Sequence, residues 1–358
     1  MTGTPPDVVC LGESMVTFLP TRPGRLADVP TFDRAIGGAE SNVACALAAA
    51  GHRTKWVGRV GQDGFGTHLT EAIGAYGVDV SAVVRDPDRP TGVYFRTATD
   101  RATAAYEVVY HRSGSAASAM SPSTVPYDVV GGGRILHLTG ITAALSDSCL
   151  ALLRELTSPR PGRPLVSFDV NFRPGLWVDP VGGGPVLLEL ARRADLVFVG
   201  ADEAEEAWGV GEADAIRALI PEPAVLVVKR GAEGATVYER SVQPRRRSRR
   251  GGPGAEPPVT DTVTHVPSPR VDVVAPTGAG DAFAAGFLHG TLRGLDAKAR
   301  LRHGHLMAAA ALTVAGDVAG SPARRAHADR LVGADDEAWG RLHLGPGWTG
   351  EDQEVRTP

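Results

Sequence analysis

A run of small residues leads directly into an apolar stretch and carries one carboxylate at the junction. The run PTGAGD covers residues 276–281, and the apolar stretch continues to residue 290. Glycines let backbone N–H groups approach a ligand closely, and the start of a helix leaves N–H groups unpaired at its positive end. The turn therefore suits a phosphate, and Asp281 suits removal of a proton from a hydroxyl group. The simpler interpretation of Asp281, as a helix cap or first-turn dipole partner, remains open here.

A second glycine turn lies near the other end of the chain. Gly37 and Gly38 precede Ser41-Asn42, which can cap a helix over residues 43–50, and Gly51 can end that helix. The chain thus has two glycine turns that each feed the start of a helix.

The elements between these turns predict an α/β fold. Short β-rich runs at 8–11, 135–138, 165–170, 196–199 and 225–229 alternate with helical stretches. This alternation is typical of a mainly parallel sheet with helices on both faces. Segments 15–36 and 91–112 have alternating or proline-interrupted patterns, which predict extra strands that form a small β lid outside the main sheet. We expect one domain over residues 7–335.

Composition narrows the class of protein. The 358 residues carry a net charge of −4 with a pI near 6.2, so nothing in the overall charge predicts nucleic acid or a membrane as a partner. Three cysteines, Cys10, Cys45 and Cys149, lie far apart in apolar segments, which predicts neither disulfides nor a metal site and fits the cytoplasm. We identify no signal peptide and no membrane-spanning run.

Two segments are expected to lie outside the packed fold. The segment 244–258 contains the cluster RRRSRR, which is followed by Gly, Pro and Glu residues. This composition predicts a disordered insertion. A polyanion-binding role for this arginine cluster is the less favoured alternative, because no aromatic residues are interleaved with it. Residues 345–358 are expected to form a flexible tail.

The nucleotide-binding motifs GxxxxGK[ST] and GxGxxG are both absent. Instead, GGAESNVACALAAAG (37–51) together with PTGAGDAFAAGF (276–287) resembles the paired signatures of the ribokinase-like carbohydrate kinases, the PfkB family. The runs VYHRSGSAAS, HLTGIT, DVNFRPGLW and VVKRGAEGA resemble the 2-keto-3-deoxygluconate kinases of this family more than its ribokinases or adenosine kinases. The resemblance covers residues 7–320 and implies a ribokinase-like fold.

The resemblance assigns roles to both glycine turns. It implies that Asp281 is the base for the acceptor hydroxyl, and that an anion hole for the transferring phosphate is formed by the N–H groups of Gly278, Ala279 and Gly280. It implies that the sugar lies against Gly37 and Gly38 and that Asn42 contacts one of its hydroxyl groups. For the first turn, a purely structural helix entry is the alternative.

Two arginines bear on the type of sugar. A sugar acid needs a fixed cation, and a guanidinium group can hold a carboxylate through two parallel hydrogen bonds. Arg112 and Arg173 match substrate-binding arginines of the keto-deoxygluconate kinases, while Tyr94 and Tyr110 match tyrosines that flank the substrate from the lid. The alternatives are solvated arginines and half-buried packing tyrosines.

The nucleotide side is also assigned by resemblance. It implies contacts to ATP from Lys229, Gly231, Gly234, Thr277 and His305, and a water-mediated contact to Mg²⁺ from Glu203. The alternatives are a lysine that extends to water and a solvated glutamate. Mg²⁺ would be held mainly by ATP oxygens and water, because it dehydrates reluctantly.

Three positions depart from the family pattern. Gly200 stands where relatives carry the Asn of an NxxE motif, and His305 stands where close relatives often have Asn. Ala275 replaces an Asp that in many relatives helps to bind a monovalent cation, so potassium dependence stays open.

Together these features predict an ATP-dependent kinase that phosphorylates the terminal hydroxyl of 2-keto-3-deoxygluconate. The alternatives are a neutral-sugar kinase, such as a fructokinase or ribokinase, and a sugar-acid-binding protein with feeble catalysis. We also expect a homo-oligomer formed through the lid, because exposed strand edges invite pairing and the family commonly uses its lids in this way.

Overall fold

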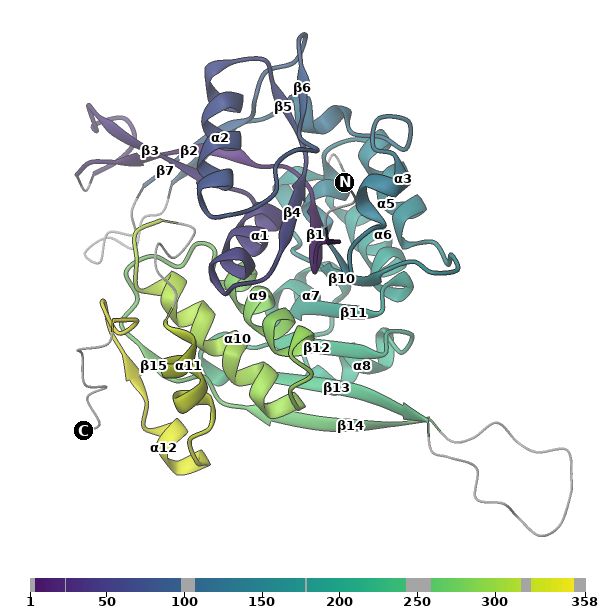
Figure 1. Ribbon diagram of the computed structural model, residues 1–358, viewed down its shortest axis with the longest axis vertical. Helices are drawn as coiled ribbons and strands as arrows, with labels where there is room; N and C mark the ends of the chain where they lie inside the picture. The colour runs from purple at the N-terminus through teal and green to yellow at the C-terminus, as the bar shows by residue number, and fades with distance from the viewer. Residues whose placement is uncertain are drawn as a thin grey trace, which may run out of the picture.

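A computed structural model describes residues 4–22, 24–97, 107–177, 179–242, 259–316 and 323–350. Its centre is an eight-stranded sheet in the order β14-β13-β12-β11-β10-β9-β1-β4 (Figure 1). Neighbouring strands are parallel from β4 to β12, whereas β13 and β14 extend the sheet antiparallel at one edge. The strands are β1 (Val8–Leu11), β4 (Thr54–Val57), β9 (Ile135–Thr139), β10 (Leu165–Asp169), β11 (Leu196–Gly200), β12 (Val225–Lys229), β13 (Ala235–Val242) and β14 (Val259–Val266). The mainly parallel sheet predicted from the sequence is confirmed.

Helices cover both faces of this sheet, as predicted (Figure 1). Because side chains alternate across a strand, Val8 and Cys10 enter one core while Val9 and Leu11 enter the other. The first core is closed by α1 (Ala39–Ala49), α2 (Gly64–Ala75), α9 (Ala279–Leu292), α10 (Ala297–Leu312), α11 (Arg325–Val332) and α12 (Asp336–Gly340). The second is closed by α3 (Tyr127–Val130), α4 (Gly140–Ala144), α5 (Asp147–Thr157), α6 (Pro180–Arg193), α7 (Ala201–Trp208) and α8 (Ala213–Leu219).

A separate four-stranded sheet has the order β3-β2-β7-β8. Its strands are β2 (Met15–Pro20), β3 (Phe32–Gly37), β7 (Val93–Arg96) and β8 (Val108–His111). Apart from Gly37 at the end of β3, they fall within the two segments from which extra strands were predicted, so these strands are confirmed. The remaining elements are β5 (Arg59–Gly61) paired with β6 (Val84–Asp86), β15 (Arg270–Val271) paired with β16 (His343–Leu344), and the 3₁₀ turns η1 (Ala116–Ala119), η2 (Pro174–Leu176) and η3 (Gly231–Glu233).

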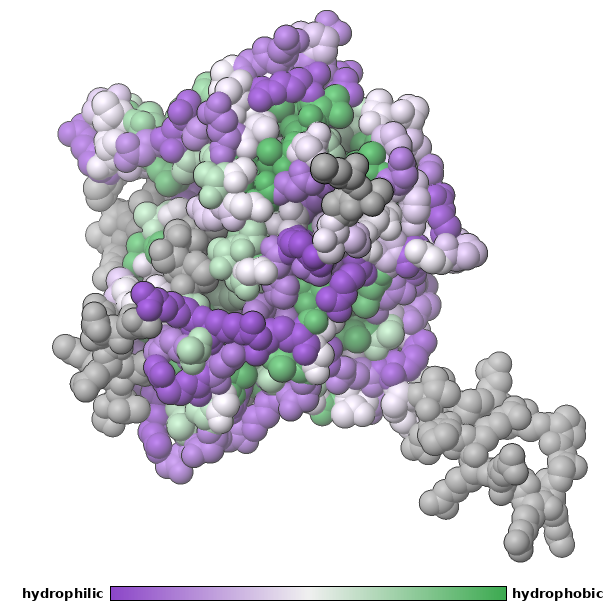
Figure 2. All heavy atoms as spheres, viewed as in Figure 1, coloured by the Kyte–Doolittle hydropathy of each residue, from purple (hydrophilic) through white to green (hydrophobic). Residues whose placement is uncertain are grey.

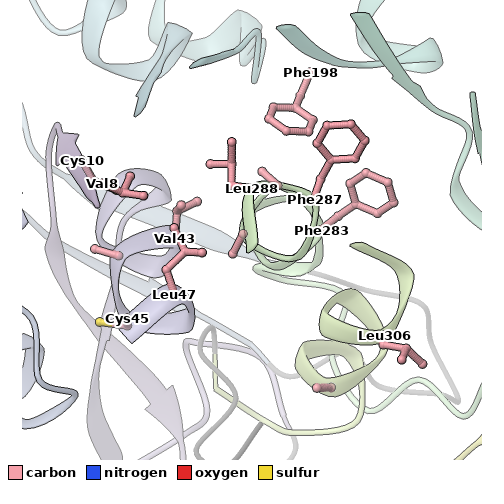
Figure 3. Packing of buried hydrophobic residues seen from close by; sticks show 14 of the residues in the cluster. Val8, Cys10, Val43, Cys45, Leu47, Phe198, Phe283, Phe287, Leu288 and Leu306 are labelled. Carbon is pink, nitrogen blue, oxygen red and sulfur yellow. The ribbon is translucent and has the colours of Figure 1, made fainter. Parts of the chain in front are cut away.

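Helix α9 is buried along most of its length. Figure 3 shows its apolar side chains between α1, α10 and the sheet, with Phe287 against Phe198 of β11. The two phenylalanine rings meet edge to face, with centroids 5.5 Å apart. On the side of α10, Gly286 permits a very close approach, because a Cβ there would lie 2.3 Å from the carbonyl oxygen of His303. The position of the first turn of α9 is thus fixed by packing along the whole helix.

The prediction of a flexible tail from residue 345 is wrong for its first residues, because the structure packs Trp348 into the core. The Trp348 side chain is only 4 % exposed and packs in the core on the α9 side of the sheet, because an indole ring buries a large apolar area. The rest of that tail, 351–358, and the insertion at 244–258 lie outside the described residues.

Hydrophilic residues cover most of the described surface in the view of Figure 2, and hydrophobic residues appear there in separate patches. Among the helices of the described ranges, none has the length and apolarity needed to cross a membrane.

The close packing of α9 on α10 can be tested by adding one methyl group. Gly286→Ala should lower the free energy of unfolding by about 1–3 kcal/mol, because the new Cβ overlaps the backbone of α10. Gly64→Ala is the matched control, since Gly64 is also helical and a Cβ there would meet nothing within 4 Å. Urea unfolding measures both, and equal stability of the two variants would contradict the packing account.

Candidate active site

A cavity of about 590 Å³ opens where the carboxyl ends of the parallel strands meet the four-stranded sheet. Ligand sites in open α/β sheets lie at this edge, where the turns between strands and helices converge. Three groups of residues line it: the starts of α1 and α9, the ends of β10 and β12, and the inner side of the small sheet. Thirteen of the predicted site residues meet here, namely Gly37, Gly38, Asn42, Tyr94, Tyr110, Arg112, Arg173, Glu203, Lys229, Thr277, Gly278, Gly280 and Asp281.

The first turn of α9 forms one wall of the cavity. Gly278 precedes the helix with φ 78°, a left-handed conformation that favours glycine, and no side chain within the described ranges caps the helix there. Ala279, Gly280 and Asp281 make up the first turn. Uncapped N–H groups at a helix start bind anions, so this geometry agrees with the predicted phosphate-binding turn.

Asp281 is held from across the cavity by α1. Asn42 donates a hydrogen bond from Nδ2 to Oδ2 of Asp281 at 2.8 Å. Burial raises the pKa of Asp281 to about 7; the Asn42 hydrogen bond opposes the rise and the nearby Asp169 charge adds to it. A carboxyl group with a pKa near neutrality is suited to general base catalysis at neutral pH.

The first glycine turn forms the floor of the cavity beside Asn42. Gly38 lies against the chain of the β1–β2 connection, since a Cβ there would be 2.4 Å from the carbonyl oxygen of Glu13. Next to this floor, Glu40 accepts hydrogen bonds at 2.8 and 2.7 Å from the hydroxyls of Thr139 and Thr142. Burial raises the pKa of Glu40 to about 7, although these two hydrogen bonds act to lower it.

Arg112 is not a free cation. It forms an ion pair with the buried Glu13, which also accepts a hydrogen bond from Ser115 at 2.9 Å. The Arg112 guanidinium lies 5.6 Å from the ring centre of Tyr110, and the rings of Tyr94 and Tyr110 are 5.4 Å apart. Arg112 Nε is buried and has no hydrogen-bond partner among the described residues, so part of its donor capacity is unused.

Arg173 lies on the other side of the cavity and is 52 % exposed. It donates to the Phe172 carbonyl at 2.8 Å and approaches Glu203 Oε1 at 3.3 Å. The other oxygen of Glu203 accepts from the Gly200 N–H at 3.0 Å at the start of α7. Glu203 therefore caps the start of its own helix, α7, and also lines the cavity.

Among the cavity residues that the sequence predictions missed, three have polar side chains: Glu13, Asp169 and Asn171. Asp169 ends the buried strand β10 and accepts from Lys229 at 2.9 and 3.1 Å. Asn171 has φ 42°, rare for a residue other than glycine, and its buried Oδ1 has no partner among the described residues. A signal was available in the run DVNFR, because polar residues directly after a buried strand lie at the edge where ligands bind.

Three predicted nucleotide residues lie elsewhere. His305 was expected beside the nucleotide, but it lies on α10 with its side chain buried in the core, with Nε2 3.1 Å from the Val266 carbonyl and its ring against Phe283. Gly231 and Gly234 do not line the cavity. Gly234 has φ 119° and its chain packs on β14, where a Cβ would be 2.2 Å from the Val266 carbonyl oxygen. That close backbone contact gives Gly234 a structural reason to be glycine.

A protein-only metal centre is absent from the described part of the chain, where no three His, Cys, Asp or Glu side chains are placed to hold an ion. The carboxylates that line the cavity, Glu13, Asp169, Glu203 and Asp281, each contact a basic or amide group. A metal at this site would therefore need ligands from its substrate.

Comparison with known proteins finds relatives over most of the chain. Residues 5–324 match the pfkB family carbohydrate kinases. The chain is 34 % identical over 325 residues to a 2-dehydro-3-deoxygluconokinase of Bacillus subtilis (strain 168), covering 89 % of this chain and 93 % of that one. It is 32 % identical over 331 residues to the 2-dehydro-3-deoxygluconokinase of Thermoproteus tenax, covering 92 % and 94 %.

Solved structures show the same fold. A PfkB protein from Polaromonas sp. JS666 superposes with a TM-score of 0.72 at 32 % identity, covering 86 % of this chain and 95 % of that one. A putative ribokinase II from E. coli, in complex with ATP and Mg²⁺, superposes with a TM-score of 0.73 at 23 % identity, covering 88 % and 96 %. With its family signatures, its sheet and its relatives in agreement, this chain belongs to the PfkB family of carbohydrate kinases.

Proposed function

We propose that the protein transfers the γ-phosphoryl group of ATP to the terminal hydroxyl of 2-keto-3-deoxygluconate. The observation that carries this proposal is the position of Asp281, a poorly solvated carboxyl with a pKa near 7 that faces both the uncapped turn of α9 and the glycine floor of α1. The two relatives named above carry the name of this activity. A base, an anion site and a sugar-sized cavity are the parts that such a transfer needs.

The chemical step follows from this arrangement. Asp281 takes the proton of the terminal hydroxyl while the hydroxyl oxygen forms its bond to the γ-phosphorus. The bond from phosphorus to the bridging oxygen breaks, and its electron pair leaves with ADP. The N–H groups of Gly278, Ala279 and Gly280 offset the charge on the phosphoryl oxygens, and the sugar rests on Gly37 and Gly38 with Asn42 beside it.

The acidic end of the sugar is assigned to the two arginines. Arg112 is paired with Glu13, which cancels its net charge. Its role is therefore to orient the carboxylate of the sugar through the N–H donors that Glu13 does not use. Arg173 is more exposed and has only a long contact with Glu203. Its positive charge is therefore less neutralised than that of Arg112 and is better able to bind the carboxylate of the sugar. Tyr94 and Tyr110 close the sugar site from the small sheet.

The nucleotide is assigned to the α9 side, where Thr277 and Lys229 line the cavity. Glu203 is the carboxylate placed to hold a water molecule of Mg²⁺, which keeps several waters when it binds nucleotides. When bound, Mg²⁺ neutralises charge on the phosphate oxygens. Gly231 and Gly234 follow Lys229 in the chain but do not line the cavity, so the nucleotide is assigned no contact with them or with His305.

The lid sheet supports a dimer proposal. Phe18, Phe32, Phe65 and Phe95 form a chain of ring contacts with centroids 4.8 to 5.8 Å apart, and Phe65 is exposed. This cluster joins strands β2, β3 and β7 to the exposed Phe65 of α2, and together with the edge strand β3 it is a suitable surface for a second copy of the sheet.

The substrate class can be tested with an ADP-release assay on a panel of sugar acids and neutral sugars. We expect turnover of 2-keto-3-deoxygluconate, and we expect Arg173→Ala to raise KM for this acid by about 10- to 100-fold with little change for ATP, because a charge-assisted contact is lost. Arg154→Ala, at an exposed ion pair outside the cavity, is the control.

Three results would contradict the assignment. Better use of fructose or ribose would favour a neutral-sugar kinase, and equal loss for acid and ATP would remove the role of Arg173. A ligand-induced rise in Tm without ADP release would indicate a binding protein.

The catalytic base can be tested by Asp281→Asn. We expect kcat to fall by about 10²- to 10⁴-fold, because the hydroxyl proton loses its acceptor, while the Tm stays close to that of the parent. Asp202→Asn serves as control, since Asp202 also lies in the first turn of a helix but is exposed. Near-normal turnover of Asp281→Asn would exclude the role.

The pH profile gives an independent test. Since the base must be ionised, kcat/KM should fall tenfold per pH unit below pH about 7, where Asp281 becomes protonated. Asn42→Ala removes a hydrogen bond that lowers the pKa of Asp281, so the acid limb should move to higher pH. An acid limb near the ordinary aspartate pKa in the parent protein would contradict the burial of the base.

A further inference from the structure

Glu40 is a buried carboxyl group in the first turn of α1, next to the glycine floor. It is 0 % exposed and does not line the cavity, whereas Ala39 and Asn42 of the same turn do. In the described part of the chain no basic side chain bonds to Glu40, and its Oε2 has no hydrogen-bond partner. Burial of a carboxyl group without a cation costs free energy, which points to its hydrogen bonds as the reason for its presence.

The backbone at the end of β1 leaves room for this carboxyl group. Gly12 directly follows β1, and a Cβ there would lie 2.1 Å from Cδ of Glu40 and 2.3 Å from each of its oxygens. Any side chain at position 12 would therefore displace the carboxyl group. The packing accommodates Glu40 in one defined position.

Two threonine hydroxyls hold the carboxyl group in that position. Thr139 and Thr142 donate to the same oxygen, Oε1 of Glu40, at 2.8 and 2.7 Å. Thr139 ends β9 and caps α4, because its hydroxyl oxygen also accepts from the Ile141 N–H at 3.2 Å. Thr142 lies in α4. Glu40 thus joins the first turn of α1 to the start of α4.

Both of the elements that Glu40 joins line the cavity. On α4, Ile141 lines it, and the start of this helix is packed on the chain that follows β10, where a Cβ on Gly140 would be 2.2 Å from the Val170 carbonyl oxygen. On α1, Asn42 lines it and donates to Asp281. A movement of one element relative to the other would therefore change the shape of the sugar site.

The link does not depend on the charge of Glu40. Burial raises the pKa of Glu40 to about 7, and the charge of Glu13, which pairs with Arg112, adds to the rise. The other titratable groups near it are the thiols of Cys10 and Cys149, whose pKa values burial raises, so both stay neutral at pH 7. The two hydroxyls need only an acceptor at Oε1, and a carboxyl group provides one with or without its proton.

We propose that Glu40 is a positioning residue for the sugar, which holds the glycine floor of α1 at a fixed distance from Ile141 of α4. The inference rests on the proposed function for the identity of the sugar, and it applies to any sugar that lies on this floor. Glu40 acts through Ala39, Asn42 and Ile141, which line the cavity. The nucleotide side lies on other elements, so binding of ATP should not depend on Glu40.

The experiment measures KM for the sugar acid and for ATP in three variants. Glu40→Met removes the acceptor and should raise KM for the sugar acid about tenfold. Thr142→Val removes one donor and leaves α1 unchanged, and it should raise this KM about three- to tenfold. Glu40→Gln keeps an acceptor oxygen, so its KM should stay within about threefold of the parent. KM for ATP should not change in any of them.

Thr157→Val is the matched control. Thr157 is also a buried threonine, but its hydroxyl donates to the Leu153 carbonyl of its own helix at 2.8 Å and it does not line the cavity. This variant should leave both KM values unchanged.

The ratio of the two KM values separates positioning from folding. If Glu40 served folding alone, Glu40→Met and Thr142→Val would lower the Tm and leave KM for the sugar acid unchanged, which would overturn the inference. An equal rise in KM for ATP, or a rise in Glu40→Gln as large as that in Glu40→Met, would overturn it as well. If Glu40→Met does not fold, Thr142→Val decides, because the carboxyl group stays in place.

Failure of the inference is distinct from failure of the proposed function. If the parent protein phosphorylates a neutral sugar instead, the proposed substrate is wrong, and KM for that sugar tests Glu40 in the same variants. If the parent binds the sugar acid without turnover, the proposed reaction is wrong, and the ligand-induced rise in Tm replaces KM. Normal turnover of the sugar acid with unchanged KM in Glu40→Met and Thr142→Val would overturn the role of Glu40 alone.

Discussion

The hydrogen bond from Asn42 to Asp281 joins the first turns of α1 and α9, and most of the site is arranged around that junction. It places the proposed base between the glycine floor of one helix and the uncapped N–H groups of the other. Its geometry depends on distant packing, because α9 is buried between α1, α10 and the sheet and cannot slide without opening that core. The apolar interior thus sets the relative positions of groups that themselves make few contacts.

Charge in the cavity is balanced by pairs rather than by one dominant ion. Glu13 faces Arg112, Asp169 faces Lys229, and Glu203 faces Arg173, in order of increasing exposure of the basic side chain. The first two pairs fix two cations at defined points, because separating such a pair leaves an uncompensated charge in a poorly solvated place. The third pair, Glu203 with Arg173, is the most exposed, so a substrate can rearrange it at the lowest cost in free energy.

The sequence was sufficient for the fold and for the residues of both glycine turns. The parallel sheet, its two helical faces and the small sheet are visible in the alternation of strands and helices, and Asp281 is visible in its turn. The pairings were not predictable, because Glu13 and Arg112 lie on different segments and nothing in either segment specifies the other. His305 was misplaced because a resemblance in sequence position does not fix which side of α10 meets the ligand. Trp348 was misplaced because the glycines and the proline around it are typical of a loop or tail and obscure one large apolar side chain.

The separation of 239 residues between Asn42 and Asp281 has a consequence for biosynthesis. During translation, the Gly37–Gly38 turn and β1 emerge early, but the proposed base and its helix emerge more than 200 residues later. Contacts between such distant segments carry a large loop-closure cost and form slowly. Half-made chains therefore expose the apolar face that α9 and α10 later cover, and catalytic competence arises only when the last third of the protein has docked on the first.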